Sequence, residues 1–154
     1  MIRVGVISDT HGMLRPQALA AMEGSDFVLH GGDIGKADIL DALQAIAPLT
    51  VVRGNNDRAD WAREVPETAR LTVGQIEVFL VHDIATLPID PAAEGIDVVV
   101  YGHSHRPRVE YKAGVMYLNP GSAGPRRFSL PISVAELLIE GDQVTARIIE
   151  LPIS

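Results

Sequence analysis

Apolar residues occur along the first third of the chain in blocks whose lengths suit strands joined by helices. Residues 2–7 and 49–52 are mostly β-branched or aliphatic, as in strands buried on both faces, and 27–29 form a shorter run of the same kind. Between these runs, residues 17–23 and 37–47 carry apolar side chains at helical spacing. The pattern therefore predicts strand, helix, strand, helix, strand.

After residue 66 the pattern changes to short apolar runs separated by glycine turns. Two pairs of runs flank Ala113-Gly114 and Glu140-Gly141-Asp142, and each pair predicts a hairpin. We therefore expect a mostly antiparallel or mixed sheet in the second half, with the two halves forming two packed sheets and the helices outside. The predicted strands are 69–73, 76–81, 97–101, 109–112, 115–118, 133–139 and 144–151.

Composition narrows the possible classes of protein. The 154 residues, 47% of them hydrophobic, suffice for a single domain over residues 1–154 with a sizeable core. The absence of cysteine excludes disulfides and thiolate metal sites, and the net charge of -7 disfavours general nucleic-acid binding unless a basic patch or bound cations reverse the local field. No stretch suits a signal peptide or a membrane span, so we expect a cytoplasmic protein without membrane association.

Histidines, acids and amides gather where the apolar runs end. The carboxyl ends of strands in α/β sheets are where such folds usually place their chemistry, and residues two apart project to one side of an extended chain. Imidazole, carboxylate and amide groups converging from several strands are the parts of a two-metal hydrolytic site. The clusters are Asp9-Thr10-His11, Gly32-Asp33, Gly54-Asn55-Asn56-Asp57, His82 and Gly102-His103-Ser104-His105.

In this order, the motifs D-x-H, G-D, G-N-x-D, a lone strand-end histidine and G-H-x-H resemble those of the calcineurin-like metallophosphoesterase family. Each motif alone arises by chance, but five in order at successive strand ends are specific. The chain looks more like the small YfcE-like phosphodiesterase branch, because of its short length and the segments 54–57, Gly-Asn-Asn-Asp, and 119–122, Asn-Pro-Gly-Ser. The resemblance implies a four-layer α/β-β/α sandwich of two mixed sheets flanked by helices. It places 119–122 beside the metals, where backbone donors could orient a ligand.

The resemblance also implies two bound divalent metal ions. A hydroxide shared by the two metals would attack phosphorus in line, in a phosphodiesterase or alternatively in a phosphomonoesterase acting on nucleotides or phosphoproteins. Mn²⁺ is the ion expected to support activity, with Ni²⁺, Fe²⁺, Co²⁺ and Zn²⁺ as alternatives. The implied ligands are Asp9, His11 and His105 on one metal, Asn55, His82 and His103 on the other, and Asp33 bridging both.

Several further residues bear on the chemistry. Asn56 stands where much of the family has a histidine that assists the leaving group, and an amide can donate a transition-state hydrogen bond but cannot act as an acid. Asp83 follows His82 at a position where many family members have glycine, and it either supports a ligand or begins a loop. We expect His30 to be partly buried and bonded to a backbone carbonyl. Arg126 and Arg127 are candidate contacts to an anionic substrate, with solvated surface charge as the alternative.

A different class of function also fits the resemblance. The metallophosphoesterase-like subunit of the retromer coat uses this fold as a protein-interaction scaffold, and such relatives have lost metal ligands. This chain has all seven ligand positions, so we expect an enzyme acting on a small phosphate ester. Exposed sheet edges would allow a homodimer or a higher homo-oligomer.

Overall fold

The computed structural model describes residues 1–153, whose strands form two mixed five-stranded sheets. The order is β10-β9-β1-β2-β3 in the first sheet and β4-β5-β6-β8-β7 in the second. In the first sheet β1 pairs parallel with β2 and antiparallel with β9, and in the second β5 pairs antiparallel with β4 and parallel with β6. The strands are β1 (Ile2–Ile7), β2 (Phe27–His30), β3 (Leu49–Val51), β4 (Thr68–Val73), β5 (Ile76–Val81), β6 (Val98–Val100), β7 (Arg108–Lys112), β8 (Val115–Asn119), β9 (Ser133–Glu140) and β10 (Gln143–Glu150).

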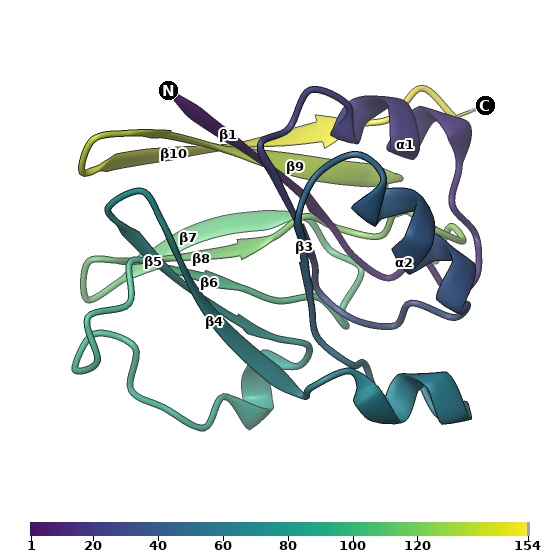
Figure 1. Ribbon diagram of the computed structural model, residues 1–154, viewed down its shortest axis with the longest axis horizontal. Helices are drawn as coiled ribbons and strands as arrows, with labels where there is room; N and C mark the ends of the chain where they lie inside the picture. Colours follow the sequence, from purple (N-terminus) through teal and green to yellow (C-terminus); the bar gives the residue numbers. More distant parts are fainter. Residues whose placement is uncertain (154) are drawn as a thin grey trace.

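The two sheets pack face to face around one apolar core (Figure 1). Val4 and Val6 of β1 point into this core, whereas Ile7 belongs to the cluster on the opposite face of the sheet. Val98 and Val100 of β6 contribute from the second sheet and are fully buried. Burial on both faces explains why these strands read as nearly continuous apolar runs.

Helices cover the outer face of the first sheet. α1 (Pro16–Met22) and α2 (Ala37–Gln44) pack there through Met22 and Leu43 (Figure 1). On the outer face of the second sheet, Ile84 and Leu87 from the segment containing the short 3₁₀ helix η2 (Ile84–Thr86) fill the same role. A further 3₁₀ helix, η1 (Asp60–Glu64), follows β3. The predicted sandwich is thus confirmed. Among residues 1–153, no helix is long and apolar enough to cross a membrane.

Two details of the sequence prediction are wrong. The helix expected over 37–47 ends at Gln44, because the backbone tightens there and the amide of Ile46 donates to Leu43 O, three residues back. The two sheets also do not correspond to the two halves of the chain, since the β9–β10 hairpin joins the first sheet beside β1. An ion pair between Arg3 Nε on β1 and Glu136 Oε2 on β9, at 2.7 Å, also joins the two strands.

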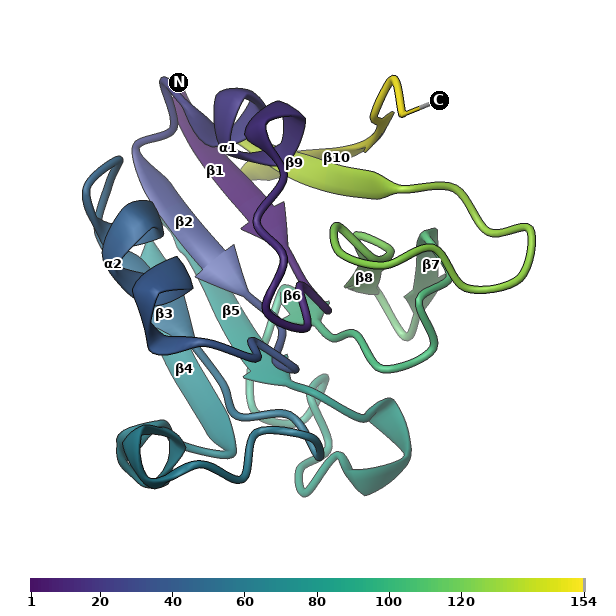
Figure 2. The ribbon, with the colours of Figure 1, turned by 90° about the vertical axis from the view of Figure 1, so that its right-hand side faces the viewer.

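The parallel strands bring the polar clusters to one edge of the sandwich. β1, β2 and β3 run in one direction in the first sheet, as do β5, β6 and β8 in the second. Figure 2 shows the arrowheads of β1, β2, β5 and β6 converging near the centre of the molecule. The loops after these strands therefore meet, although they are far apart in sequence.

Candidate metal centre

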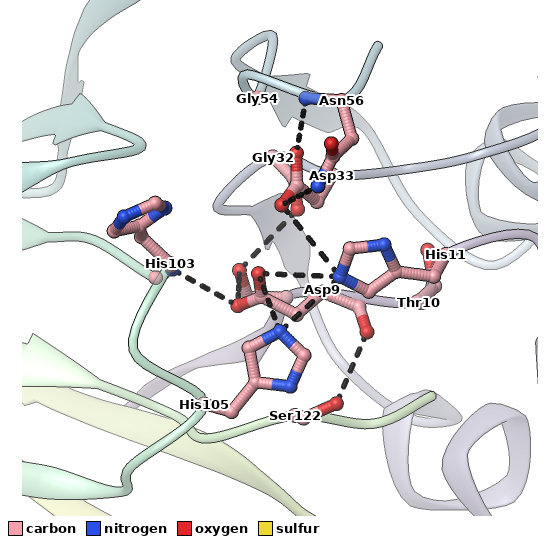
Figure 3. Close-up of polar contacts among 12 residues, drawn as sticks. Asp9, Thr10, His11, Gly32, Asp33, Gly54, Asn56, His103, His105 and Ser122 are labelled. Carbon is pink, nitrogen blue, oxygen red and sulfur yellow. Dashed lines mark hydrogen bonds and ion pairs between the residues drawn. The ribbon is translucent and has the colours of Figure 1, made fainter. Parts of the chain in front are cut away.

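Asp9, His11 and His105 form the first ligand group, with Asp9 and His11 after β1 and His105 after β6 (Figure 3). The Nε2 atoms of the two histidines lie 3.2 Å apart, and Asp9 Oδ1 is 3.9 Å from that of His11 and 3.5 Å from that of His105. Within residues 1–153 this buried carboxylate oxygen has no hydrogen-bond partner. A carboxyl oxygen that lacks a hydrogen-bond partner and faces two imidazole nitrogens fits a divalent cation between them.

The second ligand group comprises Asn55, His82, His103 and Asp33. Asn55 Oδ1 lies 3.0 Å from His82 Nε2 and 3.2 Å from His103 Nδ1, and Asp33 Oδ2 is 3.2 Å from His82 Nε2. His82 Nδ1 donates to the carbonyl oxygen of Gly31 at 2.7 Å, so when the ring is neutral its lone pair is on Nε2. A lone pair that faces two oxygens fits a second cation at this point.

Asp33 lies between the two groups. Its Oδ2 atom is 3.6 Å from Nε2 of His11 and 3.2 Å from Nε2 of His82, a position that suits the bridging role implied by the family resemblance. Asn56 holds this carboxylate in place, because its backbone N–H donates to Oδ1 at 2.9 Å and its side-chain amide donates to Oδ2 at 3.2 Å. The structure therefore brings all seven predicted ligand residues together.

Burial has the largest influence on the ionisation of the first group. It raises the pKa of Asp9 to about 7 and lowers that of His105 to about 4, with the positive charge of Arg127 adding to the latter shift. Burial would also raise the pKa of Asp33, but hydrogen bonds from protonated His82 and from the backbone N–H of Asn56 hold it well below its usual range. Burial lowers the pKa of His82, but the hydrogen bond to Asp33 and the charges of Asp9 and Asp33 outweigh it and raise that pKa, so a cation bound at Nε2 would take the place of a proton. His105 is thus a neutral imidazole and Asp33 a carboxylate at neutral pH, the forms in which these groups bind metals.

The backbone is strained at most of the ligand positions. Residues other than glycine seldom adopt a positive φ, and strain of this kind clusters at functional sites, where the surrounding structure enforces it. Gly54 contributes to that enforcement, since an added Cβ would collide with the Asp33 side chain and backbone. The strained ligands are Asp9 (φ 55°), His11 (47°), Asp33 (57°), His103 (74°) and His105 (62°).

Asp57, for which the sequence predicts no role, stabilises the loops around the centre. It is buried and accepts hydrogen bonds from the backbone N–H groups of Ile34, Gly35 and Gly54, at 3.1, 3.0 and 2.9 Å. It therefore ties the loop that carries Asp33 to the loop after β3. Its place in the Gly54-Asn55-Asn56-Asp57 motif is the signal that could have identified it.

Replacing Asp57 by alanine is expected to lower the free energy of unfolding by about 3 kcal/mol, because the N–H groups of Ile34 and Gly54, which are buried, and that of Gly35 lose their acceptor. The matched control is Asp60→Ala, whose side chain is 95% exposed and whose loss should cost at most about 0.5 kcal/mol. Urea denaturation followed by circular dichroism measures both values. Similar losses in the two variants would contradict the role of Asp57.

His30 differs from its predicted environment. It is fully buried, and it bonds not to a backbone carbonyl but to Gly32 and Thr10. The N–H of Gly32 donates to His30 Nδ1 at 3.0 Å, so the ring proton is on Nε2 and donates to the Thr10 hydroxyl at 3.1 Å. That hydroxyl donates in turn to Ile34 O at 2.7 Å. Burial lowers the pKa of His30 to about 3, so a neutral histidine braces the loop around Asp33.

The segment 119–122 lies beside the centre as expected, and its side chains form hydrogen bonds to the loops that carry the ligands. Asn119 Nδ2 donates at 3.1 Å to Gly102 O and to the Ser104 hydroxyl, on either side of His103. The Ser122 hydroxyl donates to Asp9 O at 3.1 Å. These contacts hold the backbone of the ligand loops, and a role of the backbone donors of the segment in orienting a ligand or a histidine stays a prediction.

Asp83 combines the two roles considered for it. Its Oδ1 accepts from the N–H of Ala85 at 3.0 Å and so caps η2, and its Oδ2 lies 3.9 Å from Nε2 of His103.

The two candidate arginines differ in their distance from the centre. Arg126 is within 3.5 Å of the carbonyl oxygens of Leu130 and Ile153, away from the ligands. Arg127 is close enough for its charge to affect His105, as described above.

Comparisons with known proteins agree with this geometry. The family described as "Calcineurin-like phosphoesterase superfamily domain" matches residues 2–142. The chain is 35% identical to a probable metallophosphoesterase of Methanothermobacter thermautotrophicus, over 95% of this chain and 91% of that protein, and 28% identical to the phosphodiesterase YfcE of Escherichia coli, over 89% and 88%. The structure of vacuolar protein sorting 29 from Cryptosporidium parvum superposes with a TM-score of 0.83 at 23% identity, over 97% of this chain and 91% of that one, which shows a shared fold.

Proposed function

Because the chain belongs to the calcineurin-like phosphoesterase superfamily, we propose that it is a dinuclear metal-dependent phosphodiesterase acting on a small phosphate ester. The observation that carries the proposal is the position of Asp33 Oδ2, within 3.6 Å of Nε2 in both His11 and His82. A carboxylate held between two groups of nitrogen and oxygen donors suits a pair of cations about 3.5–4 Å apart. Donors that mix nitrogen and oxygen favour Mn²⁺, Fe²⁺, Co²⁺, Ni²⁺ or Zn²⁺, and Mn²⁺ is our choice for activity.

Asp33 and Asn56 would have different roles in hydrolysis. When bound, the two cations would supply an activated water and neutralise charge on the phosphoryl oxygens. Asp33 would set the spacing of the two ligand groups, and Asn56 would keep its carboxylate oriented through the hydrogen bonds described above. Asn56 is exposed, and its amide has a second hydrogen that could be donated to the substrate phosphate.

Arg127 is the residue we assign to the anionic substrate. The loop that carries it begins against the centre, because an added Cβ at Gly124 would collide with the Thr10 backbone and Ser122 bonds to both Asp9 O and Pro125 O. Arg127 is exposed, and its guanidinium can donate two parallel hydrogen bonds to phosphate oxygens. The proposal thus retains one of the two arginines predicted from the sequence.

Replacing Arg127 by glutamine is expected to raise KM for a phosphodiester about tenfold, since a charge-assisted hydrogen bond to phosphate contributes about 1.5 kcal/mol. Arg126→Gln removes the same charge from the neighbouring position and should change KM less than twofold. Steady-state kinetics of the two variants in the presence of Mn²⁺ separates the two arginines. Equal effects would show that Arg127 acts only through the overall charge of the loop.

The proposed activity is tested by removing all metal from the protein and restoring Mn²⁺, Ni²⁺, Zn²⁺ and Mg²⁺ separately. The substrates are bis(4-nitrophenyl) phosphate and 4-nitrophenyl phosphate, which share a leaving group that needs no proton donor. Metal-restored cleavage of the diester is the expected result. Preference for the monoester would favour a phosphomonoesterase, and stoichiometric metal binding without turnover of either would favour an interaction scaffold of the same fold.

A further inference from the structure

A second cavity opens beside the proposed metal centre, on the side of His103. It has a volume of about 370 Å³, compared with about 200 Å³ for the hollow next to Asn55 and His82. Its walls come from the segment 101–106, from β7 and from the beginning of η2. Because His103 lines the cavity and is also a proposed ligand, a molecule bound at the centre could extend into this space.

The β7 wall of the cavity carries more positive than negative charge. Arg108, Glu110 and Lys112 alternate along the strand and so lie on one face of it. Glu110 pairs with both cations, at 2.8 Å from Arg108 Nη2 and 3.4 Å from Lys112 Nζ. Lys112 Nζ also lies 5.3 Å from the ring centroid of Tyr117. One carboxylate shared by two cations leaves both able to bind a further anion.

Arg106 adds a third cation, between the ligand loop and β7. It is exposed, and within residues 1–153 its guanidinium takes part in no ion pair or hydrogen bond; only its backbone N–H is bonded, to the Ser104 hydroxyl at 3.3 Å. The other acid of the cavity, Asp83, is occupied by capping η2 and by facing His103. The cavity therefore concentrates positive charge in a chain whose net charge is -7.

We propose that this cavity binds a second anionic group of the substrate, a phosphate or a carboxylate, while the scissile phosphoester lies at the metal centre. Arg106 is the principal donor, since it has no competing partner in the described chain, and Arg108 is the second. The inference rests on the proposed phosphoesterase function, because it takes the metal centre as the site of the first phosphoryl group. It narrows the substrate class to phosphate esters with a negative charge on one substituent.

Binding of stable phosphonates tests this assignment separately from turnover. Calorimetry on the Mn²⁺-loaded protein compares 3-phosphonopropionate with propylphosphonate, and 4-phosphonobutyrate with butylphosphonate, so that each pair differs by a terminal carboxylate at one of two lengths. At least one carboxylate should bind about tenfold more tightly than its partner. Arg106→Gln should reduce that preference below threefold. Arg63→Gln, which removes a charge that is 79% exposed on η1, should preserve it.

Equal affinities in both pairs, no binding of either carboxylate, or a preference that survives Arg106→Gln and Arg108→Gln together would overturn the inference. The carbon–phosphorus bond of these probes is not hydrolysed, so the preference is measured whatever the turnover. A retained preference without diester hydrolysis would contradict the proposed function alone. Hydrolysis without any preference would contradict the second anion site alone.

Discussion

Replacing Asp33 by asparagine is expected to lower kcat for an activated phosphodiester about a thousandfold, because several kcal/mol of transition-state stabilisation depend on the paired cations. The variant keeps the size of the side chain but removes the charge of the oxygen that lies between His11 and His82. Bound metal should fall from two ions per chain to one or none. Kinetics and elemental analysis of the same preparation measure both quantities.

Asp60→Asn is the matched control for this substitution, since it removes an exposed carboxylate on η1 and should leave metal content and kcat unchanged. An Asp33→Asn protein that retains two metals and normal turnover would refute the bridging role. Retention of two metals with reduced turnover would instead assign Asp33 to catalysis without a role in metal affinity.

Metal removal is expected to destabilise the fold as well as abolish turnover. Binding to the native state alone contributes about 4 kcal/mol when the free metal is a thousandfold above its dissociation constant, and each kcal/mol corresponds to about 2–4 °C in Tm for a chain of this size. We therefore expect Mn²⁺ to raise Tm by about 10 °C. The physical reason is that the cations would bind Asp9 Oδ1, which has no hydrogen-bond partner within residues 1–153, and the facing Nε2 atoms of His11 and His105.

Differential scanning calorimetry with and without chelator measures this shift. His105→Ala provides the comparison, because a protein that lacks one ligand of the first group should show a smaller rise with Mn²⁺. Ca²⁺, which prefers oxygen donors, serves as the control cation and should stabilise less than Mn²⁺. The same Tm with Mn²⁺ and with chelator would contradict metal binding at these residues.

The strands could be predicted because they follow from local patterns, and the ligand set because the motifs at the strand ends resemble those of a known family. Ile2–Ile7 is an apolar run whose exit delivers Asp9 and His11, and the same logic places His82 and His103 after β5 and β6. The pairing of strands that are far apart in the sequence could not be predicted in this way. Local hairpin signals define β9 and β10 but not the edge they join, which depends on pairing with β1.

The supporting residues of the site were also beyond a reading of the sequence. Nothing in the sequence around His30 distinguishes a ring bonded to Thr10 from one bonded to a carbonyl, because the partner comes from another loop. The positive φ angles at Asp9 and Asp33 follow from tertiary contacts and not from residue propensity. Arg126 and Arg127 are adjacent and identical in type, so only the path of the loop determines which of them lies near the centre.

We expect two metal ions to act together at a centre divided by Asp33, and titration of the metal-free protein with Mn²⁺ while diester hydrolysis is followed measures whether they do. The rate should rise until two equivalents per chain are bound and then stay constant, with elemental analysis at the plateau giving two ions per chain. A plateau at one equivalent, or hydrolysis that is independent of added metal, would rule out this pair of cooperating ions.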